Sequence, residues 1–246
     1  MNISIIPQLK NSYLLLAAIF LILSCNSKDK EASQLLTIST PMDSILEHPE
    51  MDELPRDEKI KLLDSLTQIL ANGSNDTVSR SNIIQVANHY FYLNEIDKYH
   101  DVSKQLVAMG DEANDTLDMA RGYQYIGDYF TDRSIPDSSY FYFTKAEKLL
   151  AETDDRENFG RVKLKKGYLI YKINDLASSE AIAIQALKIA HEVKDLTLEY
   201  ECYNFLSSVL TAQNKYDEAI QYNEKALKTL DEFTDDPQYF TLLKSQ

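Results

Sequence analysis

The sequence predicts an all-α protein, built as a right-handed superhelical stack of antiparallel helix pairs. Three observations lead to this fold class. A spacing of 40 residues recurs through residues 80–235. Within each step, apolar residues recur at the three- and four-residue intervals of a helix. An Asn or Ser stands in the middle of each step, where the chain must turn. A fixed period of this length indicates stacked structural repeats.

Six columns of residues carry the 40-residue spacing. Three columns hold small residues, where helices must approach closely, and one holds large apolar residues. A fifth holds turn residues that tolerate the left-handed conformation, and a sixth holds aspartates that can cap the following helix. The columns are Ala146, Ala186 and Ala226; Gly127, Gly167 and Ser207; Ser139, Ser179 and Ala219; Phe130, Ile170 and Leu210, with Tyr90 before them; Asn94, Ser134, Asn174 and Asn214; and Asp115, Asp155, Asp195 and Asp235.

Each step is predicted to form one helix pair, called a rung below, and four rungs fill residues 77–236. The first rung covers Thr77–Asp111 and turns at Asn94. Pro136 opens the second helix of its rung, because a missing N–H costs little in the first turn. The later rungs are predicted as Thr116–Asp132 with Pro136–Glu152, Glu157–Ile173 with Leu176–Val193, and Thr197–Ala212 with Tyr216–Phe233.

The segments on either side of the rungs are predicted to cap or tether the stack. Residues 57–76 form an N-terminal capping helix and its loop. Residues 25–56 form a polar linker that prolines interrupt. Residues 237–246 form a C-terminal helix, which is either the terminal cap or the start of a truncated repeat. The capping helix has one apolar face, made of Ile60, Leu63, Leu66, Ile69 and Leu70.

The columns resemble the tetratricopeptide repeat (TPR). That pattern places a large apolar, a small and an aromatic or aliphatic residue on the first helix, followed by alanine-like, aromatic and alanine positions on the second. The last three rungs supply Tyr123, Gly127, Phe130, Ser139, Phe143 and Ala146; Lys163, Gly167, Ile170, Ser179, Ala183 and Ala186; and Tyr203, Ser207, Leu210, Ala219, Asn223 and Ala226. Lys163, Ala183 and Asn223 depart from the pattern, and the step of 40 exceeds the usual 34. The resemblance covers residues 80–246 and implies a TPR-like α-solenoid.

Residues 1–24 are predicted to be a signal peptide. Tyr13–Leu23 is an unbroken apolar run of 11 residues, which is too short to span a bilayer but fits a signal-peptide core. The run ends at Cys25 and resembles a bacterial lipoprotein signal, although Leu23 replaces the usual small residue. This resemblance implies lipidation of Cys25 and a membrane anchor. The alternatives are an ordinary secretory signal and an uncleaved anchor.

The composition argues against several partners and gives no sign of catalysis. The net charge of −14 becomes one unit more negative if Lys10 leaves with the signal, which argues against nucleic acid as a partner. The four histidines, the six glycines and the second cysteine, Cys202, form no metal, phosphate-binding or nucleophile motif. We therefore predict no enzyme activity, no cofactor, no metal and no small-molecule substrate, and we interpret Cys202 as a core residue.

In the TPR family the first helices line a concave groove that holds peptides or partner helices. Carried over by register, the resemblance implies a partner-binding groove in which Arg121 and Arg161 lie one step apart. We therefore predict a partner segment with a carboxylate near both arginines. The alternative is that the tyrosines fill the packing between rungs and the arginines pair with nearby aspartates. The groove residues are Asn88, Phe91, Tyr92, Arg121, Gln124, Asp128, Arg161, Leu164, Tyr168, Tyr171, Asn204 and Ser208.

The predicted function is that of a membrane-anchored scaffold or adaptor that binds a peptide or a partner protein. Its predicted location is the bacterial cell envelope, lipid-anchored to the outer membrane, with the stack facing the periplasm or the cell exterior. Two alternatives remain. Extracytoplasmic repeats of histidine kinases and helix-turn-helix regulators look similar, and a longer reading frame would supply their output domain. Some outer-membrane assembly accessories are also lipidated repeat proteins.

Overall fold

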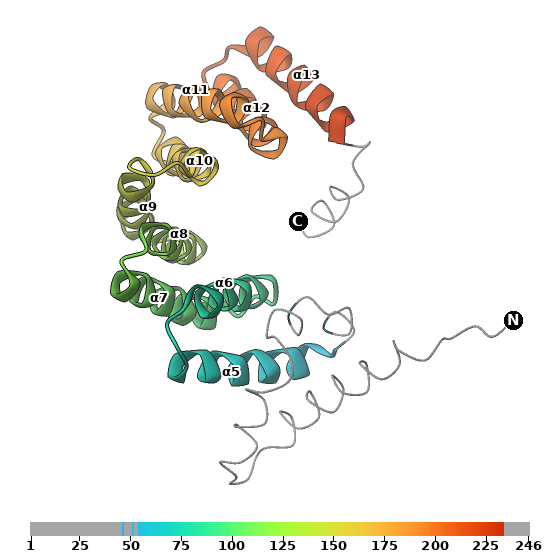
Figure 1. The fold of residues 1–246 in the computed structure, drawn as a ribbon. Helices are drawn as coiled ribbons and strands as arrows, with labels where there is room; N and C mark the ends of the chain where they lie inside the picture. The colour runs from blue at the N-terminus through green and yellow to red at the C-terminus, as the bar shows by residue number, and fades with distance from the viewer. Residues whose placement is uncertain (1–45, 47–50, 52–53, 234–246) are drawn as a thin grey trace, which may run out of the picture. The chain divides into compact units, whose positions relative to one another are not determined.

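The structure, a computed structural model, describes residues 46, 51 and 54–233. Every regular element in this described part is an α-helix (Figure 1). The predicted signal peptide, Cys25, most of the linker and the predicted helix at residues 237–246 lie outside it. The helices are α5 (Arg56–Asn72), α6 (Thr77–Tyr92), α7 (Ile96–Ala113), α8 (Thr116–Asp132), α9 (Pro136–Leu150), α10 (Arg156–Lys172), α11 (Leu176–Val193), α12 (Leu196–Ala212) and α13 (Tyr216–Phe233).

The helices form the predicted stack of antiparallel pairs, so the fold class is confirmed. Helix α8 pairs with α9, α10 with α11, and α12 with α13 (Figure 1). Successive pairs pack through α9 against α10 and through α11 against α12. The chain divides into two compact units, residues 1–102 and 103–246, and the boundary falls within α7. Each unit has its own buried side chains.

Aspartates stand at the start of the first helices, as predicted. The side chain of Asp115 accepts hydrogen bonds from the backbone N–H groups of Leu117 and Asp118, at 3.1 and 3.2 Å. Asp155 and Asp195 accept equivalent bonds in α10 and α12. These bonds satisfy N–H groups that have no partner within the helix. The capping role of these three aspartates is therefore confirmed, and the fourth aspartate of the column lies outside the described residues.

The turn column adopts the left-handed backbone conformation. Asn94, Ser134, Asn174 and Asn214 have φ angles of 57°, 57°, 65° and 62°. Asparagine tolerates this region because its short amide can hydrogen-bond to the nearby backbone. Ser134 takes the same conformation, and Pro136 then occupies the first turn of α9, as predicted. Each rung therefore reverses direction with the same local geometry.

Two glycines of the small column sit where helices approach closely. A Cβ at Gly127 would lie 2.5 Å from the ring of Phe143 on α9, which confirms the close crossing predicted within that rung. At Gly167 the nearest atom belongs to Phe205 of the next rung, at 3.0 Å, and Ile182 of the same rung follows at 3.3 Å. The closest approach at Gly167 is therefore between rungs, because the large ring of Phe205 reaches across the junction.

Small residues lie in the hydrophobic core between the third and fourth rungs. Ala186 and Cys202 are completely buried in one cluster that draws on α10, α11 and α12. The alanine column therefore meets the next rung, as predicted. Burial raises the pKa of the Cys202 thiol, and its interpretation as a core residue is confirmed. Ala183, which departs from the TPR pattern, belongs to the same cluster as the larger Phe205.

The junction between the second and third rungs holds a cluster of three charges. Glu147 on α9 accepts hydrogen bonds from Lys163 Nζ at 2.7 Å and from Lys166 Nζ at 2.5 Å, and the three side chains are 11–20% exposed. Burial raises the pKa of Glu147, but the hydrogen bonds and charges of the two lysines outweigh this effect and hold the pKa below its ordinary value. Lys163 departs from the TPR pattern because it forms an ion pair where the family has an apolar contact.

Different polar partners join the third and fourth rungs. Asp195, which caps α12, also accepts a hydrogen bond from Arg161 on α10, at 2.5 Å. Gln213, at the end of α12, donates to Glu180 on α11 at 2.8 Å. Lys215 adds a longer ion pair to the same carboxylate, at 3.4 Å. The two junctions of the second unit are therefore held by unrelated sets of charges.

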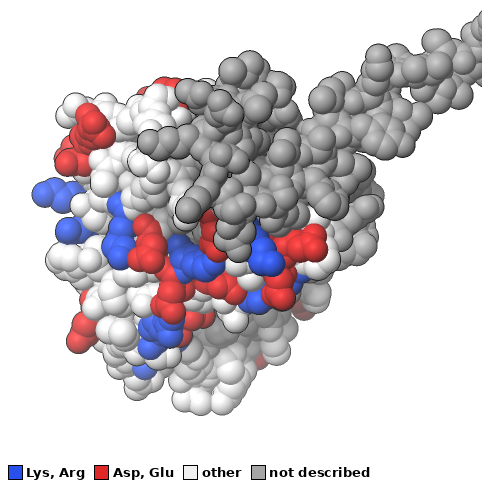
Figure 2. Space-filling model, turned by 90° about the horizontal axis from the view of Figure 1, so that it is seen from below, with Lys and Arg blue, Asp and Glu red and all other residues white. Residues whose placement is uncertain are grey.

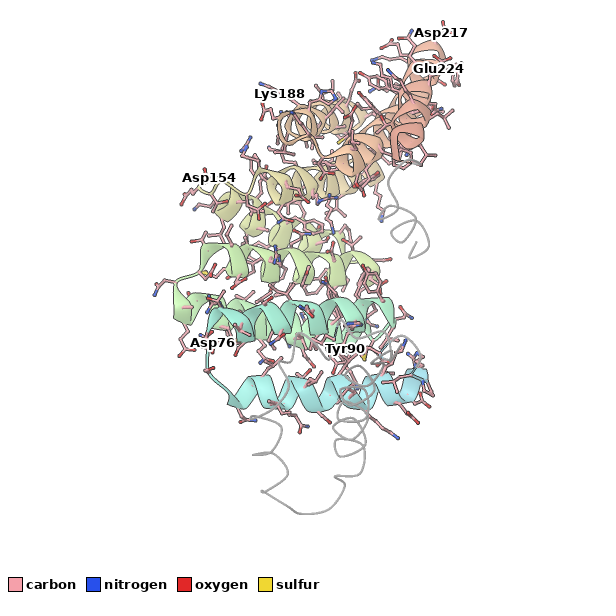
Figure 3. All side chains as sticks on the ribbon, turned by 45° about the vertical axis from the view of Figure 1, so that its right-hand side comes forward. Asp76, Tyr90, Asp154, Lys188, Asp217 and Glu224 are labelled. Atoms are coloured by element: carbon pink, nitrogen blue, oxygen red, sulfur yellow. The ribbon has the colours of Figure 1, made fainter. Side chains whose placement is uncertain are left out.

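In the first unit, helix α5 packs on α6 through leucines and a polar network. Leu62 is buried with three leucines of the predicted apolar face, whereas Ile60 and Ile69 are only half-buried. Asp64 accepts bonds from Lys98 Nζ at 2.6 and 2.7 Å and from the hydroxyl of Tyr90 at 2.8 Å. Tyr90 lies near the end of α6 (Figure 3). Its ring occupies the buried position that the apolar column predicts, and its hydroxyl group donates a hydrogen bond to Asp64 of α5.

Candidate partner-binding site

A pocket of about 460 Å³ crosses the first helices of three successive rungs. It lies in the second unit, and α8, α10 and α12 all contribute to it. Four of its six lining residues belong to the groove that the TPR resemblance implies. The lining residues are Gln124, Arg161, Leu164, Lys165, Tyr168 and Glu201. We call this cavity the first-helix pocket.

Two of the predicted residues form the buried part of this pocket. Leu164 is 2% exposed and belongs to the hydrophobic core cluster, and Gln124 is 9% exposed. The prediction that these side chains lie open on a groove surface is therefore corrected. The α10 backbone turns Leu164 toward the core between rungs, so that it contributes an apolar floor rather than an exposed contact.

The basic residues of the pocket already have acidic partners. Arg161 Nη2 lies 2.5 Å from Asp195 Oδ2 and 3.3 Å from Glu157 Oε1. Lys165 Nζ lies 2.5 Å from Asp128 Oδ1 on α8. The alternative that the arginines pair with nearby aspartates therefore holds for Arg161. Asp128, a predicted groove residue, is one of these partners.

Glu201 differs from the other charged residues of the pocket. It is half-buried, and within the part of the chain that the structure describes no hydrogen bond or ion pair reaches its carboxylate. Burial raises the pKa of Glu201, and the charges of Arg161 and Lys165 oppose this rise without cancelling it. The pocket therefore contains one carboxylate whose hydrogen-bonding capacity is unused.

Two tyrosines of α10 pack on Phe205 of α12. The rings of Tyr168 and Phe205 have centroids 4.0 Å apart, and Tyr171 meets the same phenylalanine edge-on at 5.8 Å. Tyr171 is partly buried against the core cluster, so it fills the packing between rungs. Tyr168 keeps 40% of its surface exposed and presents one aromatic surface to the pocket.

The remaining predicted residues of the second unit lie outside the pocket lining. Arg121 is half-buried, and none of the described residues forms an ion pair with it. Ser208 is exposed and donates to the backbone carbonyl of Asn204 at 3.0 Å. The sequence predicted that Arg121 and Arg161 together bind one carboxylate of the partner. In the structure, however, Arg161 is already paired with Asp195.

The predicted residues of the first unit form a separate site. Asn88 and Tyr92 line a pocket of about 250 Å³ together with Leu46, Gln85 and His89. Phe91 is exposed, and its ring contacts those of Tyr92 and Tyr99. The aromatic surface predicted for the first rung is therefore present on α6.

Sequence reasoning missed two pocket residues, Lys165 and Glu201. Glu201 stands 40 residues after Arg161 and 80 after Arg121, so the repeat spacing alone could have placed it at the same level. Lys165 gave no such signal. A further pocket of about 480 Å³ was also not predicted, and it lies on the turn side of the second and third rungs. Its lining residues are Pro136, Asp137, Tyr140, Leu169, Ile170, Ile173, Asp175 and Ser178.

Two further kinds of feature, a cluster of metal ligands and a membrane-spanning helix, are not found among the described residues. Among them, no group of three or more His, Cys, Asp or Glu side chains is placed to hold a metal. No helix in residues 54–233 combines the length and the apolar character that crossing a membrane requires. Positive and negative side chains alternate on the surface that Figure 2 shows, without a field of one sign.

The chain has the fold of TPR-like repeat proteins. The crystal structure of BtubC (BKLC) from P. vanneervenii matches it with a TM-score of 0.66 at 14% identity, over 91% of this chain and 92% of that chain. A Rap protein complexed with Competence and Sporulation Factor matches with a TM-score of 0.66 at 15% identity, over 96% and 69% of the two chains. A STAND protein with a tetratricopeptide repeat sensor, from Pyrococcus horikoshii, matches with a TM-score of 0.60 at 14% identity, over 98% and 43%.

At these identities the similarity establishes the fold and nothing finer. No protein-family model matches the sequence, and no curated protein is similar to it. The predicted TPR resemblance is therefore confirmed by structure, whereas the identity of a partner has to be argued from the residues of the site.

Proposed function

We propose that this chain is a membrane-anchored adaptor that binds an extended peptide or a partner protein on its first helices, without catalytic activity. The first-helix pocket carries the proposal, because it crosses three successive rungs at the register that the TPR resemblance marks for partner binding. Its volume lies within the range of ligand-binding pockets. A Rap protein with the same fold is itself complexed with Competence and Sporulation Factor, which supports a binding role.

Site-specific photocrosslinking in the native cell tests this proposal. A photoreactive benzoylphenylalanine replaces Tyr168 in the full chain, and a matched variant carries it at Lys188. Lys188 lies on α11, its side chain is 79% exposed, and it points away from the ribbon (Figure 3). We expect one discrete crosslinked protein from position 168 and none of that species from position 188. Equal crosslinking from both positions, or none from position 168, would contradict the proposal.

We further propose that a lipid on Cys25 anchors the protein in the bacterial cell envelope, in the outer membrane. The support is the apolar run that ends at Cys25, which fits the core of a signal peptide. Cells that express a tagged full chain are fed a clickable fatty acid, beside a Cys25→Ala control. Label that disappears in the control supports the anchor. Absence of label in both forms would remove it and would favour a secreted or N-terminally anchored repeat protein.

A sensory role within a longer signalling protein is a second candidate. The observation in its favour is the STAND protein of Pyrococcus horikoshii, whose repeats are described as a sensor and whose length exceeds the matched region, since the match covers 43% of it. Sequencing the transcript beyond the codon for Gln246 tests this candidate. A stop codon at that point would exclude it, and an output domain in frame would favour it over the adaptor.

A further inference from the structure

We infer that the first-helix pocket receives a basic side chain, Arg or Lys, of the partner segment, with Glu201 as the residue that selects it. This inference rests on the proposed function and names the chemistry of its site. It replaces the partner carboxylate that the two arginines of the sequence predict. The observations that carry it are the pairing of the basic groups, the unused carboxylate and the aromatic ring beside it.

Among the charged residues that line the pocket, the group without a partner is negative, not positive. Arg161 is paired with Asp195 and Glu157, and Lys165 is paired with Asp128. A carboxylate from a partner would have to displace one of these acids from its cation. It would also meet the repulsion of the acids that remain. Recognition of an acidic side chain is therefore disfavoured at this place.

Glu201 is a carboxylate that a bound cation would stabilise. It is half-buried at the wall of the pocket, and no hydrogen bond from the described residues reaches it. A carboxylate that loses hydration without gaining hydrogen bonds is unfavourable. A guanidinium or an ammonium group supplies both the opposite charge and N–H donors, and such charge-assisted bonds are the strong ones. The raised pKa of Glu201 reflects the same loss of hydration.

Tyr168 and Leu164 provide the rest of the binding surface for a long basic side chain. The ring of Tyr168 is held against Phe205 at 4.0 Å while 40% of its own surface stays exposed. Such a ring attracts a cation placed over its face. Leu164 forms an apolar floor that can cover the methylene groups of Lys or Arg. Carboxylate, ring and floor together match the three parts of such a side chain.

A binding measurement with small probes tests the inference on the detergent-solubilised full chain. The probes are N-acetyl-arginine methylamide and N-acetyl-glutamate methylamide, and the observed signal is the ¹³C-labelled methyl group of Leu164. We expect saturable shifts with the arginine probe alone. Glu201→Gln, which keeps the shape of the side chain, is expected to weaken this binding roughly tenfold. The matched control, Glu218→Gln, removes an exposed acid on α13 and is expected to leave the binding unchanged.

The outcomes separate this inference from the proposed function. Saturable shifts with the glutamate probe, or equal binding of the arginine probe by Glu201→Gln and the wild type, would overturn the inference. Circular dichroism of each variant checks that the helices persist. Photocrosslinking from position 168 is then repeated in the Glu201→Gln background. Loss of the crosslinked species supports the inference. Its persistence at full strength refutes the role of Glu201 while the adaptor function stands.

Discussion

The substitution Glu147→Gln tests whether charges hold two rungs together. It leaves Lys163 and Lys166 facing a neutral amide at a junction where the three side chains are only 11–20% exposed. Each lost charge-assisted bond contributes about 1.5–3 kcal/mol in net terms. Removing one partner of a fully buried pair costs about 3–5 kcal/mol. Because the lysine ammonium groups can still reach water along their flexible stems, we expect a loss of about 2–3 kcal/mol.

Urea unfolding followed by circular dichroism measures this loss. With a slope of about 2–3 kcal/mol per molar urea, the midpoint should fall by about 1 M. The pKa of Glu147 is lowered in the folded protein. The stabilisation is therefore present above the carboxyl's ordinary pKa and is lost as the pH falls through the lower folded value. The difference between wild type and variant should accordingly disappear in acid.

A matched variant separates the charges from the space that they occupy. Replacing all three residues with apolar ones, as Glu147→Leu, Lys163→Leu and Lys166→Met, removes the ions without leaving any of them unpaired. Such replacements are often neutral or stabilising, so we expect a free energy of unfolding within about 1 kcal/mol of the wild type. Unchanged stability of Glu147→Gln at neutral pH would refute the reasoning, because the lysines would then need no anion.

Three further predictions concern other positions. Gly127→Ala should destabilise the fold by about 1–3 kcal/mol in urea unfolding, because its Cβ would lie 2.5 Å from a ring, and a gain in stability would contradict the close crossing. Asp195→Ala removes a helix cap and the partner of Arg161, so it should cost about 1 kcal/mol more than Asp155→Ala, which removes a cap. Equal costs would show that the pair contributes nothing. Cys202 should react with a thiol reagent only on unfolding, because it is completely buried, and rapid labelling of the folded chain would contradict this.

The repeat spacing predicted the backbone better than it predicted the site. The turn column and the aspartate caps follow from local chemistry, because Asn94 and Asp115 act on the backbone within a few residues. The same spacing assigned Leu164 to the groove face, but it could not show that the hydrophobic core buries this side chain. Sequence distance hides such burial, since Leu164 packs against residues of α11 and α12.

Charge pairs were the least predictable feature. Glu147 meets Lys163 across 16 residues and Lys166 across 19, and neither interval is a period of the repeat. Arg161 meets Asp195 across 34 residues, an interval shorter than the 40-residue step. Because these contacts depend on how neighbouring rungs are offset, they become visible only when the stack is built.

The two junctions of the second unit carry different charged groups, so each rung fits only its own neighbour. If α12 stacked on α9 in the place of α10, Tyr203 and Leu206 would stand one step after Lys163 and Lys166 and would face Glu147. If the α10 of another copy took the place of α12 against α11, its Lys163 and Lys166 would face Leu187, which stands one step after Glu147. Either wrong pairing leaves at least one charged side chain without an ion-pair partner. Chains built from similar units are prone to exchange them with a neighbouring copy while they fold, and these unpaired charges penalise that exchange.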